Sequence, residues 1–165
     1  MLTEQQAKAL IALVDQQTKL AALLLRTLDA EKLALTNRDR LQIEACATQK
    51  VELISQLETL EQNRCRQLIQ WNPGVNPRQM SQVFAQIPKE QKPDAAKQFR
   101  QLRQTLRACS RQNQTNGAII HVAKQFTQRV LATLRGQPIA LSESPLYGPN
   151  GQAFSAAENH SVVKV

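Results

Sequence analysis

The feature that most constrains this chain is a repeat of mostly apolar residues between residues 99 and 134. The repeat advances by alternating steps of three and four residues without interruption. This is the heptad spacing of helices that pack knobs-into-holes, and it does not suit a strand, whose side chains alternate with a period of two. The sequence therefore predicts a long amphipathic helix that must bury one stripe against other helices. The repeat comprises Phe99, Leu102, Leu106, Cys109, Asn113, Asn116, Ile120, Ala123, Thr127, Val130 and Leu134.

Glycine and proline divide the rest of the chain into further helical segments. Neither residue occurs between Thr3 and Thr36, where leucines recur at helical spacing, and a second segment of this kind ends at the stretch "WNPGVNP". We expect Asn76 before Pro77 to cap a short helix, and Pro93 to open the fourth helix. The expected helices span residues 3–36, 38–71, 77–86 and 94–135.

These segments predict an all-α fold. None of the long helices can bury its stripe alone, so we expect an elongated antiparallel bundle of three long helices plus one short helix, with coiled-coil-like packing. The bundle would comprise residues 1–136. Residues 137–165 would form a flexible, irregular C-terminal tail that contains the sequence LYGPNGQ.

Two asparagines interrupt the apolar repeat at consecutive positions, Asn113 and Asn116. A polar residue in such a seam costs stability but fixes register and the choice of neighbour. We therefore expect these two residues to form a structural polar layer. On this basis, replacing both with leucine is expected to raise thermal stability or to change the oligomeric state.

The charge of the chain is concentrated in the fourth helix. Residues 95–135 hold eight basic residues and no acidic one, while the rest of the chain has 13 basic and 13 acidic residues, so this helix carries the whole net charge of +8. A row of this kind either pairs with acidic residues of a neighbouring helix, for which Glu52, Glu58 and Glu61 are candidates, or meets a partner. Four of the basic residues share one face, namely Arg100, Arg103, Arg107 and Arg111.

The apolar arc of the fourth helix widens after Gly117. Ile119, Val122, Phe126 and Val130 add to the apolar residues Ile120, Ala123 and Leu134 and roughly double the width of the apolar face. Either the short third helix and the tail cover this surplus, or a partner helix does. We interpret these four residues as a candidate partner-binding surface.

Several function classes find no support in the sequence. His121 and His160 lack metal ligands at suitable spacing, and there is no acid pair, nucleophile motif or phosphate-binding loop, so we expect no enzyme, no metal and no cofactor. The longest apolar run is far shorter than the roughly 20 residues of a membrane span, and no targeting segment is visible. Three dispersed cysteines, Cys46, Cys65 and Cys109, fit a reducing compartment. A soluble cytoplasmic protein is expected.

Two motifs resemble a known family. The stretch "LRQTLRACSRQNQTNGAII" matches the pattern of leucines, spaced asparagines, Asn-Gly and an apolar run found in the FlgN-like flagellar export chaperones. The tail sequence "LYGPNGQ" matches that family's Tyr-Gly-x-x-Gly-Gln, and two glutamine- and leucine-rich helices precede both motifs. The "WNPGVNP" segment departs from the family pattern.

The resemblance implies a bacterial cytoplasmic chaperone for type III export in flagellum assembly. Such a protein binds the C-terminal helical segment of hook-associated proteins, which join hook to filament, and prevents their self-association. It then delivers them to the cytosolic domain of the export-gate membrane protein. The family's tail tyrosine, which contributes to docking at the gate, corresponds to Tyr147, and Leu146 beside it offers a second apolar contact.

Two other readings remain open on the residues alone. A purely structural or adaptor helical bundle would need no exposed apolar arc. A nucleic-acid binder would need the row of arginines free of acidic partners, although no aromatic residue interleaves them.

Overall fold

The computed structural model describes residues 1–135 and the backbone of residues 146–147 and 153–154. Three helices are long: α1 (Glu4–Asn37), α2 (Arg40–Trp71) and α4 (Lys92–Leu134). Between α2 and α4 lie the short α3 (Met80–Ala85) and η1, a 3-10 helix at Lys89–Gln91. The predicted all-α fold with three long helices and one short helix is confirmed. Contacts divide the chain into two units, Met1–Val122 and Ala123–Val165, and α4 continues from the first into the second.

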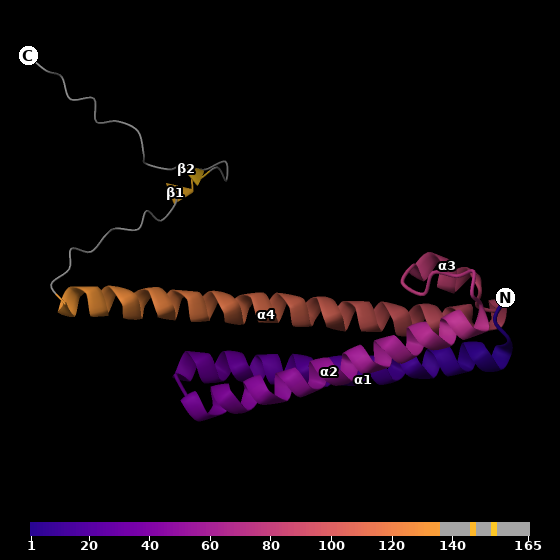
Figure 1. The fold of residues 1–165 in the computed structure, drawn as a ribbon, viewed down its shortest axis with the longest axis horizontal. Coiled ribbons are helices and arrows are strands. Elements are labelled where there is room, and N and C mark those ends of the chain that lie inside the picture. The colour runs from indigo at the N-terminus through magenta and orange to yellow at the C-terminus, as the bar shows by residue number, and fades with distance from the viewer. Residues whose placement is uncertain (136–145, 148–152, 155–165) are drawn as a thin grey trace, which may run out of the picture. The chain divides into compact units, whose positions relative to one another are not determined.

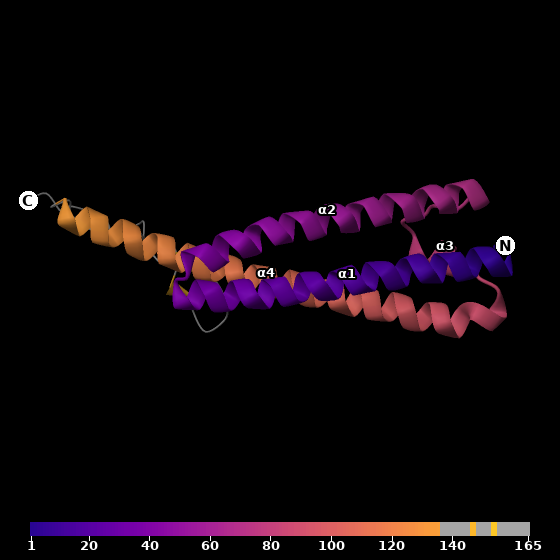
Figure 2. The same ribbon diagram turned by 90° about the horizontal axis from the view of Figure 1, so that it is seen from below.

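The first unit is built on the hairpin of α1 and α2. These helices run antiparallel, and the first part of α4 runs alongside them in the same direction as α1 (Figures 1 and 2). Thr3 and Gln6 form a reciprocal capping box at the start of α1, and the side chain of Asp39 accepts from the backbone N–H of Gln42 at the start of α2. Arg38 turns the chain between the helices in the left-handed conformation, with φ 57°.

Two clusters of buried apolar residues hold this unit together. The first, near the N-terminus, joins α1, α2, α3 and the start of α4. The second lies further along the hairpin, where Leu24 and Leu28 of α1 meet Leu53 of α2 and Cys109 of α4. The predicted leucine stripes of the first two helices therefore supply the core. The first cluster comprises Leu2, Ala7, Leu10, Leu68, Val75, Val83, Ile87 and Ala95.

The segment after "WNPGVNP" differs from the prediction. Asn76 was expected to cap a helix starting at Pro77, but its side-chain Oδ1 accepts from the N–H of Arg78, 3.0 Å away, and closes a turn instead. The helix begins only at Met80. Val83 of this helix is fully buried in the first cluster, so α3 covers the end of the hairpin.

The face that α4 buries is rotated from the predicted seam. Among its buried and partly buried positions, a series with alternating steps of three and four runs through Ala95, Gln98, Leu102, Thr105, Cys109, Gln112, Asn116 and Ile119. Leu106, Asn113 and Ile120 of the predicted seam are each replaced by the preceding residue, whereas Phe99 stays partly buried against the first cluster. As a result Leu106 and Ile120 remain 42% and 48% exposed. The heptad spacing was predicted correctly, but the side of the helix that is buried was not.

In the second unit, α4 continues to Leu134, and a short antiparallel pair of strands follows. Strand β1 (Leu146–Tyr147) pairs with β2 (Ala153–Phe154), with Leu146 opposite Phe154 and Tyr147 opposite Ala153. The Gly- and Pro-containing residues 148–152 connect them. The structure thus adds a two-stranded pairing to a tail for which no regular structure was predicted.

Candidate protein-docking site

The far half of α4 exposes large apolar side chains. Of the four residues predicted to bind a partner, Val122, Phe126 and Val130 are 64%, 61% and 41% exposed, and Ile119 is partly buried. Their spacing places all four on one side of the same helix. We call these four residues the distal face. The short helix α3, one of the elements expected to cover them, is instead packed among Leu2 and Leu68. Exposed apolar neighbours on α4 are Ile120, Leu131 and Leu134.

A groove that the sequence did not predict lies in the first unit, between α2, α3 and the first half of α4. Its volume is about 1300 Å³. Apolar side chains contributed by all three helices form much of its wall, so it exists only because α3 folds back beside α4. The apolar lining consists of Leu57, Met80, Phe84, Ala85, Ala96, Phe99, Leu102 and Leu106.

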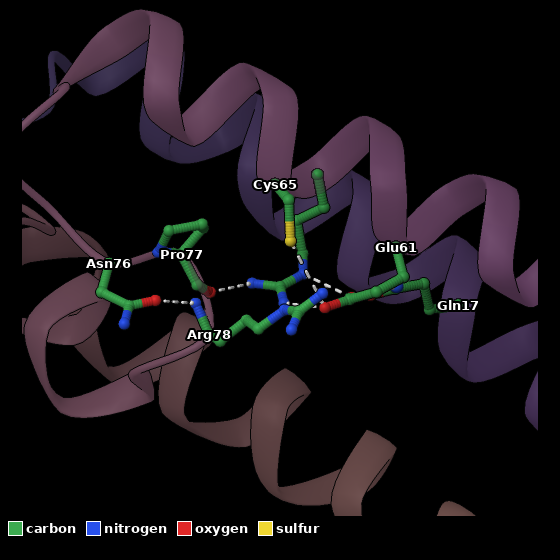
Figure 3. Close-up of polar contacts among 7 residues, drawn as sticks. Gln17, Glu61, Cys65, Asn76, Pro77 and Arg78 are labelled. Atoms are coloured by element: carbon green, nitrogen blue, oxygen red, sulfur yellow. Dashed lines mark hydrogen bonds and ion pairs between the residues drawn. The ribbon is translucent and has the colours of Figure 1, made fainter.

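Polar contacts brace the α2 side of this groove (Figure 3). Arg64, almost fully buried, donates through Nη2 and Nε to the two oxygens of Glu61, at 2.6 and 2.9 Å. Gln17 of α1 donates to Glu61 Oε2 at 3.0 Å, and Arg64 Nη1 lies 3.4 Å from the carbonyl oxygen of Pro77. One ion pair therefore connects α1, α2 and the loop that leads to α3.

This network shifts the protonation of its members. Burial raises the pKa of Glu61, but the hydrogen bonds from Arg64 and Gln17 outweigh it and hold the pKa of that carboxyl below its ordinary value. Burial and the neighbouring Glu61 carboxylate raise the pKa of the Cys65 thiol. Glu61 thus stays ionised as the partner of Arg64, and Cys65 stays a neutral thiol.

The row of arginines on α4 faces the groove and does not pair with acidic residues of a neighbouring helix. Arg100, Arg103 and Arg107 belong to its wall, and Arg111 lies beyond it. Within residues 1–135, no ion pair joins any of these four arginines to a carboxylate. Two of the three candidates for pairing are engaged elsewhere, since Glu61 binds Arg64 and Glu52 accepts from Gln56, and Glu58 lines the groove without forming an ion pair with these arginines.

The two asparagines of the predicted polar layer are separated by the rotation of α4. Asn113 is exposed, whereas Asn116 is buried. Asn116 Nδ2 donates to the carbonyl oxygen of Leu28 at 2.9 Å and to Glu31 Oε2 at 2.8 Å. Only one member of the pair is therefore placed to join the helices.

The predicted gate-docking residues Leu146 and Tyr147 form β1, and the structure describes only their backbone. His160 lies outside them as well. Among the side chains of residues 1–135, no group of three His, Cys, Asp or Glu residues gathers at a metal-binding distance. Of the helices that the structure describes, none has the length and hydropathy to cross a membrane.

Sequence reasoning missed the groove for an identifiable reason. Leu102 and Leu106 beside the arginine row were a signal, but the alternating repeat suggested that a helix would cover both. The "WNPGVNP" segment positions α3, which forms one wall of the groove. The apolar periodicity of the helices does not indicate this role.

The chain matches the model of a protein family described as FlgN protein, over residues 1–154. Neither the curated proteins nor the solved structures that were searched gave a match.

Proposed function

This chain belongs to the FlgN family of flagellar export chaperones, and from that premise we propose that its cargo is the C-terminal helical segment of a hook–filament junction protein. The chaperone holds this segment in the cytoplasm, prevents its premature self-association and delivers it to the flagellar export gate. The family match covers both motifs on which the resemblance rests, the asparagine-containing stretch of α4 and LYGPNGQ.

The observation that best supports cargo binding is the exposure of the distal face. Phe126 is 61% exposed and Val122 64%, although large apolar side chains gathered on one surface are costly to leave in water. Such patches commonly mark protein-binding sites. A helical cargo that presents its own apolar stripe would cover these residues by packing along α4, as in helix-in-groove recognition.

Delivery would rest on the tail. Tyr147, with Leu146 beside it, would contact the cytosolic domain of the export-gate membrane protein. A tyrosine provides a large amphipathic contact at low entropic cost, which suits an anchor for a reversible contact. The support for this part of the proposal is the motif itself.

Calorimetric titration tests the cargo proposal. The purified protein is titrated with the C-terminal helical segment of a junction protein from the same bacterium. Phe126→Asp should weaken binding by several kcal/mol if Phe126 is a buried anchor of the complex. Gln128→Asp, on the opposite side of α4, introduces the same charge and should leave the affinity within about threefold, less than half of 1.4 kcal/mol.

Circular dichroism of the free variants completes the test. Both should keep the helix content of the parent because both positions are exposed. Equal affinities for the parent and Phe126→Asp, or a loss of helix content in Phe126→Asp alone, would refute the assignment of the distal face.

A further inference from the structure

The groove between α2, α3 and α4 is not used by the proposed cargo and gate contacts. It lies wholly within the first unit and shares no residue with the distal face. Leu106, in its wall, is 42% exposed, and Phe84 and Phe99 meet there edge to face with ring centroids 6.3 Å apart. An apolar channel of this kind is costly to leave in water, so a ligand that covers it would gain free energy.

The size of the groove suits a segment of protein better than a small molecule. Its volume of about 1300 Å³ exceeds the roughly 300–1,000 Å³ of ordinary ligand pockets. Along α4 its lining extends from Lys92 to Ser110. At about 1.5 Å per residue this length is roughly 27 Å, or about five turns of a docked helix.

The charges of the groove define the chemistry of its occupant. Six basic and two acidic residues belong to the lining, and Arg64 and Glu61 neutralise each other. Glu58 is the remaining acid. Within the described part of the chain, no ion pair is formed by the remaining basic residues, which are Arg78, Lys92, Arg100, Arg103 and Arg107.

We propose that this groove docks an amphipathic helix of a partner protein whose apolar stripe is flanked by acidic residues. The stripe covers Leu57, Phe99 and Leu106, and the acidic flanks meet the arginines of α4. The site is separate from the distal face, and its existence does not depend on the proposed cargo.

A second copy of this chain is a poorer occupant because it lacks the complementary charge. Helices α1 and α2 each contain four acidic and four basic residues, and α4 is strongly basic. Nucleic acid satisfies the arginines, but its phosphate backbone gains nothing from an apolar wall. Only a protein segment that is apolar on one side and acidic beside it uses both properties.

The experiment uses two synthetic helical peptides with the same leucine stripe, one flanked by glutamates and the other by lysines. Fluorescence anisotropy measures the binding of each to the full chain at low and high salt. The glutamate peptide should bind saturably and more weakly as salt rises, and the lysine peptide should bind at least about tenfold more weakly.

Charge-reversal variants locate the binding site. Arg103→Glu combined with Arg107→Glu should reduce the affinity for the glutamate peptide by more than about tenfold. The matched control combines Arg111→Glu with Arg129→Glu, which changes the charge of the same helix equally but outside the groove lining. The loss of affinity in this control variant should be several-fold smaller than in the groove variant. Leu106→Asp should weaken binding, and Phe126→Asp should not.

Four results would overturn the proposal. The first is the absence of saturable binding of the glutamate peptide, and the second is equal loss in the groove and control variants. The third is displacement of the peptide by duplex DNA whose phosphate concentration equals the carboxylate concentration of the peptide, which would indicate a phosphate site. The fourth is self-association of the parent chain that Leu106→Asp abolishes, which would make a second copy the occupant.

Discussion

The side-chain nitrogen of Asn116 lies 2.8 Å from Glu31 Oε2, and this contact joins two helices through residues 85 positions apart in the sequence. Lys50 of α2 donates to the other oxygen of the same carboxylate at 2.7 Å. Glu31 is 4% exposed. A single buried carboxylate therefore connects all three long helices, with both oxygens hydrogen-bonded.

This contact reverses the stability change expected from the sequence. Asn116→Leu would remove a donor from Glu31 and from the carbonyl oxygen of Leu28, leaving buried acceptors short of a partner. We expect it to lower the free energy of unfolding by about 1–3 kcal/mol. Asn113→Leu, at an exposed position of the same helix, should change it by less than about 0.5 kcal/mol. Urea denaturation of both variants checks this, and a gain in stability for Asn116→Leu would contradict it.

The ion pair of Glu61 and Arg64 predicts a pH dependence. The pKa of Glu61 is lower in the folded state than the ordinary value of about 4.3, so the unfolded chain binds a proton more readily as the pH falls. The stabilisation is present above that ordinary value and is lost as the pH falls through the folded pKa. Glu61→Gln should therefore lower the urea midpoint at pH 7 and make little difference near pH 3.

Glu58→Gln supplies the control for this comparison, because Glu58 is an exposed carboxylate on the same helix. It should change the midpoint at pH 7 much less than Glu61→Gln does. If the difference between the parent and Glu61→Gln were the same at both pH values, the hydrogen bonds from Arg64 and Gln17 would not stabilise the ionised carboxylate.

The exposed part of α4 should be dynamic in the free protein. From Ile120 to Leu131 every side chain is exposed, so little buried apolar surface supports the helix in this stretch. Hydrogen exchange should be faster there than between Leu102 and Asn116, where the helix packs on the hairpin. Added cargo segment should slow exchange in the exposed stretch. Equal protection of both halves in the free protein would show that another part of the chain covers the distal face.

The turn between α1 and α2 offers a way to stabilise the protein. Arg38 adopts φ 57°, a conformation that costs a residue with a side chain about 1 kcal/mol and glycine much less. Arg38→Gly should raise the thermal midpoint or leave it unchanged. Arg26→Gly, in the interior of α1, replaces the same residue type and should cost about 1 kcal/mol. Equal destabilisation by both changes would exclude a role for the left-handed conformation.

Tyr147→Ala tests whether the tail docks at the export gate while the bundle binds cargo. The variant should keep its affinity for cargo within about tenfold, or 1.4 kcal/mol, and lose binding to the cytosolic domain of the export gate. Phe154→Ala removes the other aromatic residue of the strand pair and is the control, with gate binding retained. A Tyr147→Ala protein that docks at the gate like the parent would leave the tyrosine without the proposed role.

The helices could be predicted because Gly, Pro and capping residues mark their ends. The expected span 38–71 agrees within two residues with α2, at Arg40–Trp71, since Asp39 caps it and "WNPG" stops it. The family was predicted from two motifs, and the match over residues 1–154 confirms it.

Hydropathy alone could not predict which face of α4 is buried. Leu102, Cys109 and Asn116 are shared by the predicted and the observed faces. The two faces differ where Thr105 and Gln112 are partly buried and Leu106 and Asn113 are exposed. Apolarity favours Leu106 over Thr105 for burial and does not choose between Gln112 and Asn113. The helix instead buries Thr105 and Gln112 in part, and the side that contains Leu106 forms the groove with α3. That outcome depends on where α3 lies, which no local pattern encodes.

The contact between Asn116 and Leu28 also has a consequence for how the chain folds. The two residues are 88 positions apart, whereas α1 and α2 are joined by a two-residue corner at Arg38 and Asp39. Closing the long loop costs more chain entropy than closing the corner, so the hairpin should form first and α4 should dock onto it afterwards. During synthesis, α1 and α2 are complete while α4 is still being translated, and until Asn116 emerges Glu31 has only Lys50 as a partner.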